Sequence, residues 1–195
     1  MGGRGQSGKT TSKDILSAKL RAALGVKGSP KTTDEALTIN PNYQRGWGWQ
    51  TNCQRTAYTY EMARRGYDVE ALAEPSGYDP YENGGWKHGF EDQQWNRFYL
   101  YEKTQVKKAI DQKMAEWGEG SRALVYVVWE GGGAHLFNAE YHNGVVRGYD
   151  AQNGRSFDIS DYLNRANPFP TMISRVDNLN QPNDILSYAM KVRGK

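Results

Sequence analysis

The chain has 195 residues, enough for one globular domain with a buried core. Its 13 tyrosines and 6 tryptophans argue against a wholly disordered chain. The formal net charge of +3 arises from interspersed basic and acidic residues, a pattern that does not indicate nucleic-acid binding. No apolar run is long enough to span a membrane, and no apolar signal segment opens the chain. Neither a nucleic acid nor a membrane is therefore expected as a partner, and the oligomeric state stays open.

Residues 1–39 are expected to form a flexible arm in front of a domain at residues 40–195. The stretch from Gly3 to Thr10 matches the P-loop pattern, but only two residues precede it, so the buried strand that a P-loop needs cannot form. A short amphipathic helix is predicted from Ser12 to Leu24, because apolar residues recur on one face and Gly25 can end it.

Cys53 is the only cysteine, so it cannot form an internal disulfide, and it fits a reducing compartment or export without a classical signal. Thr51 and Asn52 can cap a helix that begins here and ends near Gly66. A thiol in the first turn of a helix lies at the positive end of the helix dipole, which favours the nucleophilic thiolate. The alternative is that Cys53 is a small buried core residue without chemistry.

Thiol acyl transfer also needs hydrogen-bond donors for the oxyanion that develops on the substrate. Gln50 and Asn52 are candidates because they lie close to Cys53 in the chain, although the simpler role for Asn52 is the helix cap. Arg55 would add to the bias towards thiolate.

The middle of the chain alternates between regular and irregular segments. A strand is predicted at residues 67–72, and the aromatic segment at residues 75–101 is either a substrate-recognition flap or a satellite hydrophobic cluster. The apolar pattern predicts a helix from Thr104 to Trp117. Residues 122–130 form the strongest strand pattern, typical of a buried central strand.

The second half of the candidate site follows that strand. Residues 134–141 and 145–150 are predicted to pair as a hairpin, with a short helix or turn at residues 158–164 and strands at 171–176 and 185–192. His135 begins one hairpin strand and Asp150 ends the other, so antiparallel pairing brings them to the same edge. A carboxylate beside an imidazole fixes its tautomer and stabilises its protonated form. Taken singly, His135 could be a strand-end histidine and Asp150 a turn former.

Three stretches carry a resemblance: Asn52 to Arg55 at a helix start, Ala134 to Asn138 before a hairpin, and Tyr149 to Gly154 after it. Together, over about residues 40–165, they resemble the papain-fold (Tox-PL) glutamine deamidase domains of bacterial polymorphic toxins, which also occur on phage head-associated proteins. Many members have a second cysteine where this chain has Thr56, and a glycine where it has Ala134.

The resemblance implies an α+β, papain-like cysteine-hydrolase fold, in which an N-terminal catalytic helix packs on an antiparallel sheet. It implies that Cys53 is the nucleophile, His135 the general base and acid, and Asp150 the orienting carboxylate, with Gln152 at the site. The expected reaction is hydrolysis of the side-chain amide of a protein glutamine, without a cofactor or a metal. The expected partners are a protein substrate and an immunity protein or a phage or host protein.

Such a toxin or effector is expected in the cytoplasm of the producing or target cell, or on a phage particle. Two alternatives stay open. One is a cysteine peptidase or isopeptidase that uses the same three residues, because both reactions pass through an acyl-enzyme. The other is a non-catalytic phage structural or host-interaction protein in which the triad is vestigial.

Overall fold

The computed structural model describes residues 12–79, 83–180, 182–183 and 185–192. Its centre is a six-stranded antiparallel sheet with the strand order β2-β7-β3-β4-β5-β6. The strands of this sheet are β2 (Asn96–Phe98), β3 (Arg122–Trp129), β4 (Ala134–His142), β5 (Val145–Asp150), β6 (Arg155–Asp158) and β7 (Ala166–Arg175). A separate two-stranded sheet pairs β1 (Val69–Ala71) with β8 (Ala189–Lys191).

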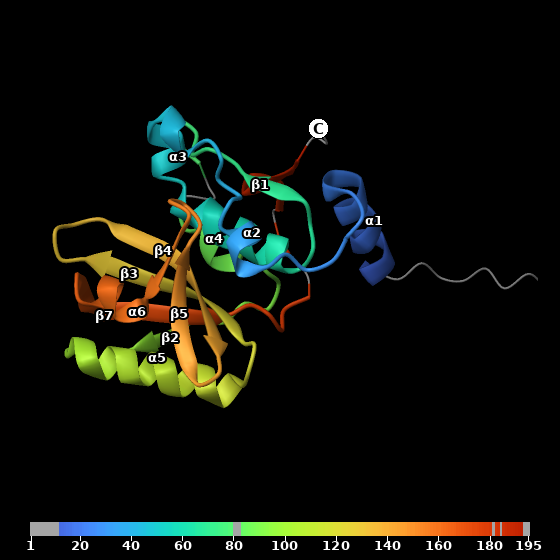
Figure 1. Ribbon diagram of the computed structural model, residues 1–195. Coiled ribbons are helices and arrows are strands. Elements are labelled where there is room, and N and C mark those ends of the chain that lie inside the picture. Colours follow the sequence, from blue (N-terminus) through green and yellow to red (C-terminus); the bar gives the residue numbers. More distant parts are fainter. Residues whose placement is uncertain (1–11, 80–82, 181, 184, 193–195) are drawn as a thin grey trace, which may run out of the picture.

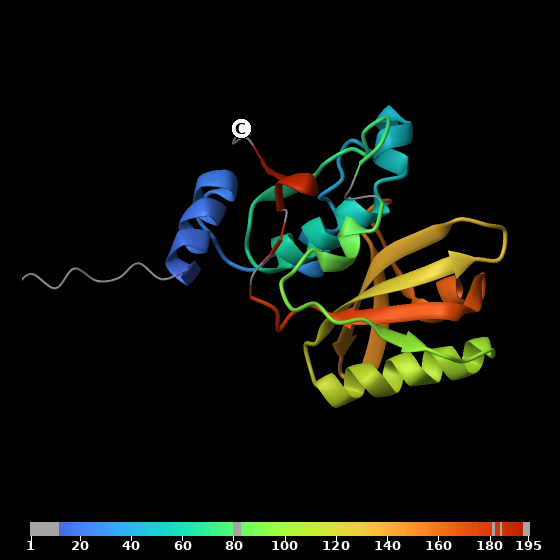
Figure 2. The ribbon, with the colours of Figure 1, turned by 180° about the vertical axis from the view of Figure 1, so that it is seen from behind.

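Helices cover both faces of the central sheet (Figures 1 and 2). The helix α4 packs on one face, and α5 runs along the opposite face together with α6. The α-helices are α1 (Ser12–Leu24), α2 (Thr33–Ala36), α3 (Trp47–Gln50), α4 (Cys53–Arg64), α5 (Lys103–Trp117) and α6 (Ile159–Leu163). Three 3-10 turns are η1 (Tyr43–Arg45), η2 (Gly85–His88) and η3 (Ile185–Ser187).

Alternation along β3 explains why the sheet has two cores. Successive side chains of a strand point to opposite faces. Leu124 and Tyr126 therefore join the α4 side, whereas Ala123, Val125 and Val127 join the α5 side. Because both faces are covered, β3 reads as a continuous apolar run, and the prediction of a buried central strand is confirmed.

Two buried glutamates attach α4 to its neighbours. Glu61, on α4, receives hydrogen bonds from Arg122 of β3 and from Arg65, each with an Nε–O distance of 2.7 Å. Glu140, on β4, accepts from Arg64 and from the Tyr60 hydroxyl, also at 2.7 Å. Both glutamate side chains are fully buried, so this pairing holds the helix in one place on the sheet.

The structure confirms the expected class, with helices against an antiparallel sheet, and most of the expected elements. The predicted helices at Ser12–Leu24 and Thr104–Trp117 and the predicted hairpin are present. The predicted last strand at residues 185–192 is wrong in its first half, where η3 precedes the short β8. Strand β7 begins earlier than residue 171, because Ala166 and Asn167 pair with the end of β3 beyond an irregularity in the register.

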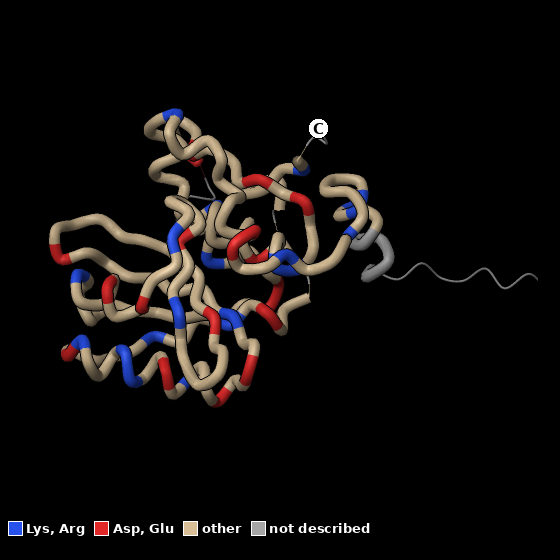
Figure 3. The backbone as a smooth tube through the Cα atoms, in the orientation of Figure 1, with Lys and Arg blue, Asp and Glu red and all other residues tan. Residues whose placement is uncertain are grey.

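The boundary expected at residue 39 stays a prediction, although Leu24, Ala36 and Ile39 are buried in the core that contains α4. The P-loop-like stretch from Gly3 to Thr10 lies outside the described residues. Basic and acidic residues are interspersed along the described chain (Figure 3). Among the described residues, no helix is both long and apolar enough to cross a membrane.

Candidate active site

Cys53 is the first residue of α4, as the sequence predicts, and the residue is 9% exposed. The amide groups at the start of α4 and the helix dipole converge on this position. Asn138 of β4 donates to the carbonyl of Ala57 in the second turn of the helix at 3.0 Å. The sulfur is thereby held at a fixed place beside the end of the sheet.

Asn52 occupies the N-cap position of α4 as predicted, but neither its side chain nor another caps the helix with a hydrogen bond. Asn52 is fully buried, and its amide nitrogen donates to the carbonyl of Leu72 at 2.9 Å and to Oδ1 of Asn40 at 3.4 Å. Thr51 does not cap the helix either, since its hydroxyl donates to the carbonyl of Trp47. Because both amide hydrogens of Asn52 have partners in the protein, this residue does not fit an oxyanion donor.

The structure brings His135 and Asp150 together as the hairpin register predicts. Strand β4 pairs with β5 up to Asn138 and Tyr149, and Asp150 follows directly. Nε2 of His135 lies 2.9 Å from Oδ2 of Asp150, and both side chains are almost fully buried. Cys53 and His135 line the same hollow, and the thiol raises the pKa of the ring. Since Asp150 occupies Nε2, Nδ1 is the ring nitrogen left for a contact with the thiol.

Asp150 is held from three further directions. Its Oδ2 atom accepts from the Tyr162 hydroxyl at 2.6 Å and from Asn153 Nδ2 at 2.8 Å, and its Oδ1 atom accepts from the backbone N–H of Gln152 at 3.1 Å. Burial raises the pKa of Asp150, but the hydrogen bond and charge of His135 outweigh it, helped by Tyr162 and Gln152, so the net pKa is lowered. The carboxylate therefore stays ionised beside the imidazole.

The same interactions set the charge of His135. Burial lowers the pKa of its ring, but hydrogen bonds and charge from Asp150 and Cys53 raise the net pKa to about 10. An imidazolium at neutral pH carries the proton that a leaving amine needs. The ring of Trp129 stacks over His135 with 5.7 Å between ring centroids, which limits its orientations.

A small hollow of about 20 Å³ lies where these groups meet. It is lined by Cys53, Gln54, Tyr126, Ala134, His135 and Leu136. In the turn before β4, Gly132 and Gly133 have positive φ angles, and a Cβ atom on either would meet nothing within 4 Å.

The remaining sequence candidates lie at the edge of this arrangement. Gln50 ends α3 and is exposed, and it does not line the hollow. Gln152 supports Asp150 through its backbone N–H. Arg55 forms an ion pair with Asp79, so its charge is directed towards that carboxylate. Among the described residues, no group of three His, Cys, Asp or Glu side chains is arranged to hold a metal ion.

Two important residues were not identified from the sequence. Asn40 donates through Nδ2 to the carbonyls of Trp49 and Gln152, at 2.9 and 2.8 Å, and so connects the segment before Cys53 with the turn behind Asp150. Tyr162 comes from α6, a helix predicted without a functional role. Neither carries a sequence signal, because each acts through a contact between segments far apart in the chain.

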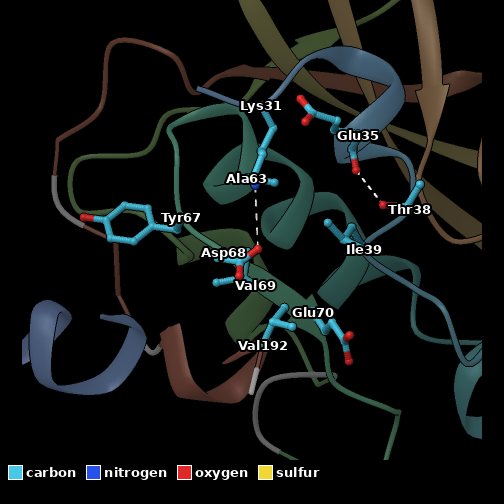
Figure 4. A pocket seen from close by; sticks show the side chains of 10 residues that line it. All are labelled: Lys31, Glu35, Thr38, Ile39, Ala63, Tyr67, Asp68, Val69, Glu70 and Val192. Carbon is cyan, nitrogen blue, oxygen red and sulfur yellow. Dashed lines mark hydrogen bonds and ion pairs between the residues drawn. The ribbon is translucent and has the colours of Figure 1, made fainter. Parts of the chain in front are cut away.

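A second hollow, of about 320 Å³, lies at the other end of α4 (Figure 4). Ala63 lines it, about 15 Å along the helix from Cys53 at 1.5 Å per residue. Its charged side chains include Lys31 and Asp68, whose Nζ and Oδ1 atoms are 3.7 Å apart. This hollow is separate from the one that Cys53 lines.

Comparison with known proteins identifies the family of the chain and a solved structure of similar fold. The family described as "Papain fold toxin 1, glutamine deamidase" matches residues 51–155, a range that contains Cys53, His135 and Asp150. The solved structure of the Salmonella effector SpvD, G161 variant, is similar in fold, with a TM-score of 0.51 and 14% sequence identity, over 89% of this chain and 95% of that chain. No curated protein matches the sequence.

Proposed function

Because the chain belongs to the papain-fold toxin family of glutamine deamidases, we propose that it hydrolyses the side-chain amide of glutamine in a target protein. The observation that carries the proposal is the Cys53–His135–Asp150 arrangement, in which the histidine lines one hollow with the thiol and contacts a buried carboxylate. Cys53 is the proposed nucleophile, His135 the general acid and base, and Asp150 the group that orients and charges the ring.

The first half-reaction forms a thioester. The Cys53 thiolate attacks the carboxamide carbon, and the carbonyl oxygen takes up the negative charge. The backbone N–H of Cys53 is the proposed oxyanion donor. It lies in the first turn of α4, where N–H groups have no partner within the helix and point out of its N-terminal end. The Nδ1 proton of His135 passes to the nitrogen, the carbon–nitrogen bond breaks, and ammonia leaves.

The second half-reaction releases glutamate. His135, now neutral, removes a proton from water, and the hydroxide attacks the thioester carbon. The carbon–sulfur bond breaks, the thiolate returns to Cys53, and the proton remains on His135. Asp150 stabilises this imidazolium at both stages without leaving its own hydrogen bonds.

The shape of the site favours a side-chain amide over a main-chain amide. Cys53 is 9% exposed, and the hollow that it lines measures about 20 Å³. A glutamine side chain can place a terminal carboxamide there, whereas a peptide bond brings two substituted Cα atoms with it. The expected protein substrate and any immunity, phage or host partner stay predictions.

Intact-mass analysis of substrate proteins and glutamine-containing peptides, together with an ammonia assay, tests the proposal. The wild-type protein should add about 1 Da per modified site and release one ammonia. The Cys53→Ala variant should do neither. Peptide fragments in place of the mass gain would show a peptidase instead. A Cys53 thiol that alkylates no faster than free cysteine at mildly acidic pH would indicate a protein without this chemistry.

A further inference from the structure

A cleft of about 480 Å³ adjoins the hollow that contains Cys53 and His135. The cleft and the hollow share three lining residues, Gln54, Tyr126 and Ala134. A substrate that places a carboxamide in the hollow therefore extends its neighbouring residues into the cleft. The residues that line the cleft would then determine which glutamine-containing sequences bind.

The part of the cleft wall that Trp86 forms is held in place by aromatic packing. Trp86, on η2, stacks on Tyr126 with 5.3 Å between ring centroids, and Trp95 meets Trp86 edge-on at 5.5 Å. Nε1 of Trp95 donates to the carbonyl of Lys87 at 2.8 Å. The part of the 75–101 segment that faces the site is therefore packed in place, and it presents Lys87 from a fixed backbone.

Among the residues that the structure describes, two cations and no carboxylate line the cleft. Lys87 and Arg97 both line it and both are exposed. Its other lining residues are neutral, and within the described part of the chain no ion pair joins either cation to an acidic side chain. Since acidic and basic residues are otherwise interspersed (Figure 3), this is a local concentration of positive charge next to the reactive sulfur.

The register of the sheet relates Arg97 to the site. Arg97 pairs with Met172, Met172 with Tyr126, and Tyr126 with Leu136, which lines the hollow. Directly paired residues point to the same face of a sheet. With about 4.8 Å between neighbouring strands, the backbone of Arg97 lies about 10 Å from that of Tyr126.

The pKa of Tyr126 also depends on both Cys53 and Arg97. Burial and then the charge of Cys53 raise the pKa of the Tyr126 phenol, while Arg97 acts against them. Cys53 and Arg97 are thus both near enough to the Tyr126 phenol to affect its pKa. An extended peptide advances about 3.3 Å per residue, so roughly three residues span the distance of about 10 Å between the backbones of Tyr126 and Arg97.

We propose that this cleft binds an acidic side chain about two to four residues from the target glutamine, with Arg97 and Lys87 as the specificity-determining residues. The inference rests on the proposed deamidase function and deepens it by naming the substrate class. The carboxylate gains charge-assisted hydrogen bonds from Arg97, and Lys87 adds to the local positive potential. Trp86 and Tyr126 supply the apolar surface along which the intervening residues lie.

Two glutamine peptides test this, one with a glutamate three positions from the glutamine and one with serine at that position. We expect the wild-type protein to have a KM roughly fivefold lower for the acidic peptide, and high salt to reduce this preference. Arg97→Glu and Lys87→Glu should each reduce the preference, and the double variant should prefer a lysine at that position. Lys108→Glu is the matched control, since Lys108 is an exposed residue of α5 on the opposite face of the sheet, and it should keep the wild-type preference.

Binding measured without turnover separates this inference from the proposed function. Fluorescence polarisation with the Cys53→Ala variant and labelled peptides should show the same selectivity for the acidic peptide. Equal affinity for both peptides, or a preference that persists in the double variant, would overturn the inference. Selective binding without ammonia release by the wild-type protein would instead overturn the deamidase function.

Discussion

The Tyr162 hydroxyl donates a hydrogen bond of 2.6 Å to Oδ2 of Asp150, the same oxygen atom that lies 2.9 Å from Nε2 of His135. Tyr162 is held in turn by Phe157, whose ring centroid is 4.0 Å from its own. The α5 side of the core thus extends to the carboxylate behind the candidate catalytic histidine. This relationship makes Tyr162 a positioning residue, since it acts through Asp150.

Tyr162→Phe keeps the ring packing and removes only the hydroxyl. Because a hydrogen bond to a charged group contributes about 1.5–3 kcal/mol, we expect kcat to fall roughly tenfold while the fold persists. A shift in the pH profile of kcat distinguishes this from a structural effect, because Asp150 then holds the imidazolium less strongly. Initial rates from ammonia release would measure it. Tyr99→Phe, at a residue that is 71% exposed, should match the wild-type protein, and an unchanged pH profile in Tyr162→Phe would contradict the role.

The pair of His135 and Asp150 should make stability depend on pH. The folded-state pKa of His135 is raised from 6.5 to about 10. Its contribution to the free energy of unfolding is therefore fully present below pH 6.5 and is lost as the pH rises through about 10. The pKa of Asp150 is lowered from 3.8, so its contribution is present above that value and is lost as the pH falls through the lowered pKa. Urea unfolding of the wild-type protein and of His135→Asn would test this across the alkaline interval. The difference in unfolding free energy should shrink as the pH rises, and a constant difference would contradict the pairing.

Glu61 should be important for stability because its carboxylate neutralises Arg65 and Arg122 in a buried position. Glu61→Gln removes the carboxylate that these two guanidinium groups share. We expect the free energy of unfolding to fall by about 3–5 kcal/mol. Denaturant unfolding at neutral pH measures it. The matched control is Glu116→Gln on α5, whose ion pair with Lys113 is half exposed and should contribute less than about 1 kcal/mol. Similar losses in both variants would show that burial does not decide the effect.

Gly148 on β5 leaves room for the ring of Phe157. A Cβ atom at this position would lie 2.5 Å from two ring carbons of Phe157, so Gly148→Ala requires the ring to move. We expect a loss of about 1–3 kcal/mol from overpacking, with reduced activity because Phe157 supports Tyr162. Thermal unfolding and ammonia release measure the two effects. Gly131→Ala, where a Cβ atom would meet nothing within 4 Å, should change stability by less than about 0.5 kcal/mol.

Local patterns along the chain were sufficient for most elements and for the three candidate catalytic residues. The start of α4 at Cys53 follows from the residues around it, although the residue expected to cap it is turned inwards. The meeting of His135 and Asp150 follows from hairpin geometry, because a short turn brings the two ends of a hairpin to one edge. These relationships are local, so the sequence contains them.

The supporting contacts could not be predicted in this way. Asn40, Tyr162 and the cleft cations Lys87 and Arg97 act across segments that only the packed sheet brings together. A side chain's partner is determined by strand order, and strand order depends on which arrangement buries the most apolar surface with its polar groups paired. By itself, the sequence determined the candidate catalytic groups and the elements that carry them. The tertiary structure decided which residues hold those groups in position and which charges line the neighbouring cleft, because both depend on contacts between segments distant in the chain.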